Sequence, residues 1–184
     1  MTNAVARYHI VSEHAVKDSE VGWTILRPNS FMSNALRWAP QLQAGDVVRE
    51  PFADVPVATI DPADIAAVSA LALTEGGHDG RTYRISGPRS MLPVDRLAVL
   101  AEVLGRDLRL EPLSDAEAKV QMRATMPAEY VDAFFRFFAE GQLDESAVLP
   151  TVAEITGREP RSFEQWARAH ADALAPAAQQ SRGV

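Results

Sequence analysis

Apolar residues recur every three or four positions through much of the chain, which is the period of an amphipathic α-helix. Within residues 93–104, for example, Leu97, Ala101 and Leu104 share one face, and Gly105 is suited to end the helix in a left-handed conformation. The same spacing predicts helices over residues 4–20, 31–38, 61–72, 93–104, 114–124, 127–140, 151–156 and 162–175.

Two shorter runs have the composition of strands. Residues 23–26 (Trp-Thr-Ile-Leu) form a dense β-forming run, which is typical of a buried parallel strand. Residues 81–86 alternate between apolar and polar side chains, as a strand does. Residues 46–60 are expected to be extended, and residues 108–110 predict one more short strand. The mixture of strands and helices predicts an α/β fold with a parallel sheet.

Several helix boundaries are visible as capping patterns. Asp61 followed by Pro62 is the clearest helix start, and capping also explains the second acid, Asp64, without a catalytic role. Asn29 and Ser30 are suited to cap the helix that begins at Phe31. That helix is expected to break at Pro40 and to finish at Gly45.

The composition restricts the partners of the chain. Its 184 residues are 47% hydrophobic, as expected of a globular domain, and the net charge of −7 argues against nucleic acid. The absence of cysteine excludes disulfides and thiolate metal sites, and the four histidines have no metal-binding spacing, so no metal site is predicted. No apolar run reaches the ~20 residues that span a bilayer. A cytoplasmic protein with a small-molecule or protein partner is expected.

The chain is predicted to form one domain over residues 1–175. Residues 1–112 would make the α/β part, residues 113–175 would make a helical cap, and residues 176–184 have the composition of a tail. The cap helices are too short to bury their apolar faces alone, so a second folding unit is not expected.

Landmarks in chain order resemble the NmrA-like branch of the atypical short-chain dehydrogenases. The motifs that carry the resemblance are Glu13, Trp23-Thr24-Ile25-Leu26-Arg27-Pro28, Asn29-Ser30-Phe31-Met32-Ser33-Asn34, Asp61-Pro62-Ala63-Asp64-Ile65-Ala66, Gly80-Arg81-Thr82-Tyr83, Ser86-Gly87-Pro88 and Thr156-Gly157-Arg158. The resemblance implies an NAD(P)-binding Rossmann-like fold in which residues 23–26 and 81–86 are the sixth and seventh strands.

The chain departs from that family at the nucleotide site. No G-x-G-x-x-G or G-x-x-G-x-x-G motif is present, although a dinucleotide fold needs such a turn to bring backbone amides to the pyrophosphate. The expected fold is therefore a partial Rossmann-like parallel sheet that lacks the N-terminal nucleotide-binding strands and carries a helical C-terminal substrate cap. NAD(P)H is the cofactor that the resemblance implies, and this chain is not expected to bind it alone.

A second departure concerns the catalytic pair. The resemblance places the family's Tyr and Lys at Val5 and His9, so both are missing, and Tyr8 points about 100° away from the required direction. The remaining catalytic candidates are His9, Glu13 and Asn34. His9 and Glu13 share a helix face at i, i+4 and could form an acid/base pair, or could simply be a histidine held by a carboxylate.

Binding residues are predicted at the carboxyl end of the first strand, where open α/β sheets place their ligands. The loop of Arg27, Pro28, Asn29 and Ser30 is the candidate cofactor contact; a plain strand-to-helix turn is the alternative. A pocket is expected between residues 27–34, 46–58 and 127–140. Its candidate lining residues are Phe31, Trp38, Phe52, Phe134 and Phe138.

Three functions remain open at this stage. The first is the substrate-binding part of an NAD(P)H-dependent oxidoreductase acting on a small apolar or quinone-like molecule. The second is a cofactor-independent cyclase, isomerase or lyase, and the third is a regulatory or ligand-sensing module. A homo-oligomer is expected, because a sheet reduced in this way exposes an edge that proteins normally cover.

Overall fold

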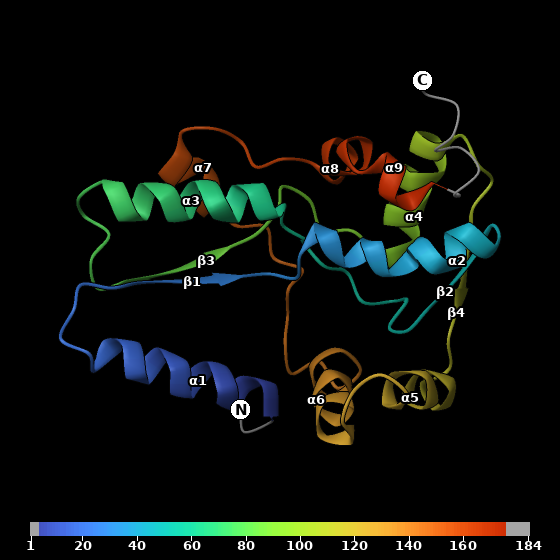
Figure 1. The fold of residues 1–184 in the computed structure, drawn as a ribbon, viewed down its shortest axis with the longest axis horizontal. Helices are drawn as coiled ribbons and strands as arrows, with labels where there is room; N and C mark the ends of the chain where they lie inside the picture. The colour runs from blue at the N-terminus through green and yellow to red at the C-terminus, as the bar shows by residue number, and fades with distance from the viewer. Residues whose placement is uncertain (1–3, 176–184) are drawn as a thin grey trace.

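The computed structural model describes residues 4–175, so the predicted tail at 176–184 lies outside the described residues. The chain alternates helices and short strands (Figure 1). The elements are α1 (Ala4–Lys17), β1 (Thr24–Pro28), η1 (Met32–Trp38), α2 (Ala39–Ala44), β2 (Val47–Glu50), α3 (Pro62–Thr74), β3 (Arg81–Ile85), α4 (Pro93–Leu104), β4 (Arg109–Pro112), α5 (Asp115–Arg123), α6 (Ala128–Phe138), α7 (Thr151–Thr156), α8 (Phe163–Ala169) and α9 (Ala171–Leu174).

The described strands pair in parallel, which confirms the predicted α/β class. β1 pairs with β3, with Ile25 opposite Thr82 and Pro28 opposite Ile85, and β2 pairs with β4 in a second two-stranded ladder. In Figure 1, α3 and α7 lie on one side of the β1–β3 ladder and α1 lies on the other. After the carboxyl end of β1, residues 29–31 lead into η1, on which the candidate site is built.

The largest apolar core joins the middle of the chain to its last helices. Trp38, Leu42 and Val48 are buried with Leu100 of α4 and Trp166 of α8. A second core lies between β1–β3, α3 and α7, and a third, smaller one lies between α5 and α6. The helices of the predicted cap are thus packed in different places. α5 and α6 pack on each other, whereas α7 packs on α3 and α8 packs on α4.

Several predicted boundaries are correct for the expected physical reason. The Asp61 carboxylate accepts a hydrogen bond from the Ala63 amide at 2.8 Å and caps α3. Gly105 ends α4 with φ 62°, in the left-handed region that suits glycine. Gly87 has another reason for being glycine, because a Cβ at this position would lie 1.9 Å from the Thr59 carbonyl oxygen.

Other predictions at helix ends are wrong. Pro40 does not break a helix; it occupies the first turn of α2, where its missing amide costs nothing. The preceding segment, η1, is a 3₁₀ helix, and neither Asn29 nor Ser30 caps it, because the N-cap position is Phe31. The interpretation of Asp64 as a simple helix-start acid is incomplete, since its buried carboxylate bonds to Arg158 and Arg161.

The predicted inner face of α1 is largely exposed. Tyr8 is 68% exposed and Val16 is 43% exposed, although the helical spacing of Val5, Tyr8, His9, Ser12 and Val16 predicts a mixed inner face there. The helix is held instead by a partly buried carboxylate, Glu13, which reaches β1, and by contacts with α6.

Candidate functional site

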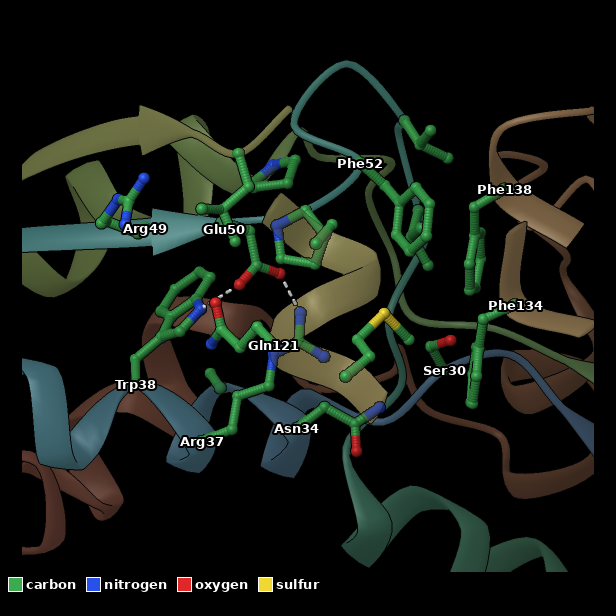
Figure 2. A pocket seen from close by; sticks show the side chains of 18 of the residues that line it. Ser30, Asn34, Arg37, Trp38, Arg49, Glu50, Phe52, Gln121, Phe134 and Phe138 are labelled. Atoms are coloured by element: carbon green, nitrogen blue, oxygen red, sulfur yellow. Dashed lines mark hydrogen bonds and ion pairs between the residues drawn. The ribbon is translucent and has the colours of Figure 1, made fainter. Parts of the chain in front are cut away.

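A cavity of about 330 Å³ opens beside the carboxyl end of β1. It lies between η1, the segment after β2, and the helices α5 and α6 (Figure 2). Its walls are formed by Ser30, Asn34, Ala35, Arg37, Trp38, Gln41, Arg49, Glu50, Pro51, Phe52, Val55, Val57, Pro93, Arg96, Leu113, Ala118, Gln121, Met122, Thr125, Met126, Phe134 and Phe138. In Figure 2, Phe52, Phe134 and Phe138 stand on one side, and Trp38, Arg37, Arg49 and Glu50 stand on the other.

The loop after β1 is fixed by a buried amide. The Asn29 backbone amide donates to the Ile85 carbonyl at 2.9 Å, which extends the pairing of β1 with β3. The Asn29 side chain donates to the carbonyls of Ala58 at 3.3 Å and Glu145 at 2.9 Å. Asn29 is 3% exposed and does not line the cavity, so its observed contacts are within the protein.

Ser30 is the residue of this loop that reaches the cavity. Its hydroxyl donates to the Glu145 carboxylate at 2.5 Å, and its backbone amide donates to the same carboxylate at 3.1 Å. Burial raises the pKa of Glu145, although the two hydrogen bonds from Ser30 act in the opposite direction. The cavity wall therefore includes a hydroxyl coupled to a carboxyl group that holds its proton to higher pH than a free glutamate.

The apolar wall is built from α6 and from a residue in an unusual backbone conformation. Phe134 and Phe138 lie one turn apart on α6 with stacked rings, 6.2 Å between centroids. The ring of Phe52 lies 5.4 Å from that of Phe138, and Phe52 has φ 55°. A non-glycine residue in this region costs on the order of 1–2 kcal/mol, and such residues cluster at ligand sites.

The polar wall is centred on one buried carboxylate. Glu50, at the end of β2, is 3% exposed and accepts a hydrogen bond from the Trp38 indole at 2.8 Å. Its other oxygen is paired with the guanidinium of Arg37, as the dashed lines in Figure 2 show. Arg96 of α4 lies over the Trp38 ring, 5.8 Å from its centroid. Both oxygens of Glu50 are therefore occupied.

The structure brings together part of the predicted site. Four of the five predicted pocket residues line the cavity: Trp38, Phe52, Phe134 and Phe138. Phe31 does not; it is 39% exposed and lies outside the lining. Among the other candidates, Ser30 and Asn34 line the cavity, whereas Arg27, Pro28 and Asn29 are neighbouring residues that do not.

His9 and Glu13 lie away from the cavity. The Glu13 carboxylate receives two hydrogen bonds from Arg27, at 2.7 and 2.5 Å, and these lower the pKa of Glu13. His9 is exposed, and its ring contacts the ring of Tyr8. Glu13 thus ties α1 to β1, and its described hydrogen bonds and ion pairs are with Arg27 and Lys17.

Sequence reasoning missed Glu50, Arg96, Arg37 and Glu145. Two of them carried a usable signal. Val48 and Glu50 are two residues apart in a strand, so they share a face, and a carboxylate on a buried face indicates a specific partner. Arg96 lies next to Leu97 and four residues before Leu100, within the apolar stripe of α4. Glu145 follows α6 in a segment without a repeating pattern, and its position depends on tertiary folding alone.

Among the residues that the structure describes, no group of three or more His, Asp and Glu side chains is arranged to hold a metal ion. None of the helices in residues 4–175 combines the length and apolar character that a bilayer crossing requires.

The chain is similar in sequence to proteins that are reductases. No family model matches it. It is 44% identical over 174 residues to (4-alkanoyl-5-oxo-2,5-dihydrofuran-3-yl)methyl phosphate reductase of Streptomyces griseus, covering 94% of this chain and 61% of that protein. It is 33% identical over 175 residues to NAD(P)H azoreductase of Xenophilus azovorans, again covering 94% of this chain and 61% of that protein. The chain thus spans about three fifths of the length of these relatives.

Solved structures show the same fold. The NADPH-dependent quinone oxidoreductase of Escherichia coli superposes with a TM-score of 0.74 at 23% identity, covering 92% of this chain and 62% of that one. Triphenylmethane reductase of Citrobacter sp. has a TM-score of 0.71 at 19% identity, covering 90% and 59%. The resemblance seen in the sequence is therefore confirmed: the chain is a partial-length relative of the NAD(P)-binding reductases of the NmrA-like atypical short-chain dehydrogenase family.

Proposed function

We propose that this chain forms the substrate-binding part of an NAD(P)H-dependent reductase that acts on a small apolar or quinone-like molecule. The observation that carries the proposal is the cavity at the carboxyl end of β1, with Phe52, Phe134 and Phe138 on one wall. Parallel sheets present their ligands at this end of the strands. Aromatic rings favour a flat, conjugated molecule, because offset and edge-to-face packing adds to the burial of apolar surface.

The described residues do not form a cradle for the dinucleotide itself. Gly77, Gly80, Gly105, Gly141 and Gly157 have positive φ, but none of them lines the cavity. Holding a pyrophosphate requires a glycine-rich turn at a helix N-terminus. We therefore propose that these residues bind the substrate, whereas NAD(P)H is the cofactor of the family and is not bound by these residues alone.

The chain also offers a group for proton transfer. Reduction of a carbonyl, quinone or azo group leaves a heteroatom that must gain a proton, and the family's tyrosine and lysine positions hold Val5 and His9. The Ser30 hydroxyl lines the cavity and bonds to Glu145, whose raised pKa keeps a proton available nearer to neutral pH. Asn34, the predicted catalytic residue that lines the cavity, supplies an exposed amide beside it and is assigned to substrate orientation.

A calorimetric titration of the chain with 2-methyl-1,4-naphthoquinone tests the substrate assignment. One molecule should bind per chain, and Phe134→Ala should weaken binding roughly two- to thirteenfold, because an aromatic pair contributes about 0.5–1.5 kcal/mol. Tyr130→Ala is the matched control, since Tyr130 lies on the same helix outside the cavity. Equal loss in both variants, or no binding to the wild-type chain, would contradict the proposal.

A parallel titration with NADPH tests whether this chain binds the substrate but not the dinucleotide. The chain alone is expected to show no micromolar affinity, because it lacks the glycine turn. Micromolar binding of NADPH to residues 1–184 would overturn this part of the proposal.

A further inference from the structure

Arg96 is a buried cation that forms no ion pair with any residue the structure describes. Its side chain lies on the first turn of α4, is 8% exposed and lines the cavity. No hydrogen bond or ion pair joins its guanidinium to another side chain of residues 4–175, and its buried Nε has no hydrogen-bond partner. The contact on its flat face is with the Trp38 ring. This is unusual, because arginines are rarely buried without a paired group.

The charges around Arg96 do not cancel. Glu50 is the buried carboxylate nearby, and its two oxygens are taken by Arg37 and by the Trp38 indole. Asp95 is adjacent, but its carboxylate accepts the Leu92 amide at 2.9 Å at the start of α4. Arg49 also lines the cavity, yet it pairs outward with Glu117 at 2.7 Å. One positive charge therefore remains uncompensated at the polar end of the cavity.

Arg96 nevertheless keeps its proton under ordinary conditions. Burial lowers the pKa of Arg96 to about 10, with a further contribution from the neighbouring charge of Arg37, while Glu50 and Asp95 act in the opposite direction. The guanidinium is thus charged at neutral pH. A buried charge of this kind is costly unless something that binds in the cavity completes its hydrogen bonding.

We propose that Arg96, supported by Arg37, is an anion subsite of the cavity, and that the ligand of this chain carries a phosphate monoester or a carboxylate on an apolar body. The inference rests on the proposed substrate-binding function and specifies its substrate class. The anionic group lies against Arg96 and the edge of Trp38. The apolar body extends towards Phe52 and Phe134 on the opposite wall (Figure 2).

The two halves of the ligand are matched by the two walls. Guanidinium groups bind phosphate and carboxylate through parallel N–H donors, and such charge-assisted bonds are about twice as strong as neutral ones. Glu50 holds Arg37 and Trp38 in place without neutralising Arg96. A molecule without an anionic group would leave this cation unsatisfied in the occupied cavity, so it should bind more weakly than its charged analogue.

The test compares probes that share one apolar body. 1-Naphthyl phosphate, 1-naphthoate and neutral 1-naphthol are titrated separately into the wild-type chain by calorimetry. At least one of the two anions should bind roughly tenfold more tightly than 1-naphthol, and whichever is preferred identifies the group as phosphate or carboxylate. Tight but equal binding of all three would support the substrate cavity and refute the anion subsite. No binding by any of them would refute both.

Substitutions then locate the subsite. Arg96→Met should reduce the anion's affinity to that of 1-naphthol and leave 1-naphthol unchanged, whereas Arg96→Lys should retain part of the preference. Arg109→Met is the control, because Arg109 is exposed on β4 outside the cavity. The Arg96→Met chain should also melt no lower than wild type, since it loses an unpaired buried charge. A retained anion preference in folded Arg96→Met would overturn the assignment.

A nucleotide phosphate is the other source of such an anion. Adenosine 2′,5′-bisphosphate is therefore added as a competitor of the preferred naphthyl probe. Absence of competition is expected if the anion belongs to the substrate. Displacement of the probe with comparable affinity would show that the subsite takes a nucleotide phosphate, and the proposed substrate class would be wrong.

Discussion

The replacement Asp64→Asn is expected to lower the stability of the chain substantially. Asp64 is fully buried on α3 and accepts hydrogen bonds from Arg158 Nη1 at 2.9 Å, from Arg161 Nη1 at 2.9 Å and from the Arg161 amide at 2.6 Å. These bonds join α3 to the segment between α7 and α8. Asparagine has the same shape, so the replacement removes the charge and one acceptor without creating a cavity.

The magnitude follows from the number of bonds and the exposure of their donors. A hydrogen bond to a charged group contributes about 1.5–3 kcal/mol, and an asparagine can satisfy at most part of the three. The two arginine side chains are 41% and 42% exposed, so water takes over some of their hydrogen bonding when the carboxylate is lost. We expect a loss of about 3 kcal/mol in the free energy of unfolding, and a fall in Tm of about 6–12 °C.

Urea denaturation followed by circular dichroism measures this loss, with Asp107→Asn as the matched control. Asp107 is exposed after α4, and its carboxylate forms no hydrogen bond or ion pair with the described residues, so its replacement should change stability by less than about 0.5 kcal/mol. A loss below about 1 kcal/mol in Asp64→Asn, or equal losses in the two variants, would refute the argument that this carboxylate connects the two segments.

Three further predictions concern single side chains. The pKa of Glu145 is raised in the folded state. Protonated Glu145 therefore stabilises the fold below the unfolded-state pKa, and this stabilisation is lost as the pH rises through the folded-state pKa. Glu145→Gln should flatten that part of the stability–pH curve. The pKa of Glu13 is lowered, so its stabilisation is present above the unfolded pKa and is lost as pH falls; Glu13→Gln should cost under about 1 kcal/mol at pH 7, because Arg27 is half exposed. Ser162→Ala removes the cap of α8 and should cost about 1 kcal/mol by thermal denaturation. Ser146→Ala is the comparison, because the Ser146 hydroxyl donates to Asp144 and caps no helix.

The sequence contained much of the local structure because local structure depends on neighbouring residues. Asp61 with Pro62, and Gly105 after Leu104, are complete signals within a few positions, and both mark helix ends in the structure. Pro40 was misinterpreted because proline is equally compatible with the end of one helix and the first turn of the next. The choice depends on packing around Trp38 and Leu42, which a linear pattern does not describe.

The candidate site was only half visible for a related reason. The wall on α6 could be predicted because Phe134, Phe135, Phe137 and Phe138 surround the helix more completely than a single buried face needs. In the structure Phe135 and Phe137 are buried, and the other two line the cavity. The polar wall is assembled from η1, β2 and α4, which are far apart in the sequence. A pattern within one segment cannot show that Glu50 pairs with Arg37 while Arg96 pairs with no carboxylate of residues 4–175.

The two walls of the cavity belong to different packing units, and this has a consequence for how such a protein can diversify. Trp38, which donates a hydrogen bond to Glu50, belongs to the large core with α4 and α8. The α5–α6 pair has its own small core of Leu113, Ala118, Val131 and Phe135. Changes at Phe134 or Phe138 can therefore reshape one wall of the cavity while the charged residues of the other wall keep their positions. Substitutions that adapt the cavity to a new ligand should therefore accumulate first on α6, where they cost the rest of the chain little stability.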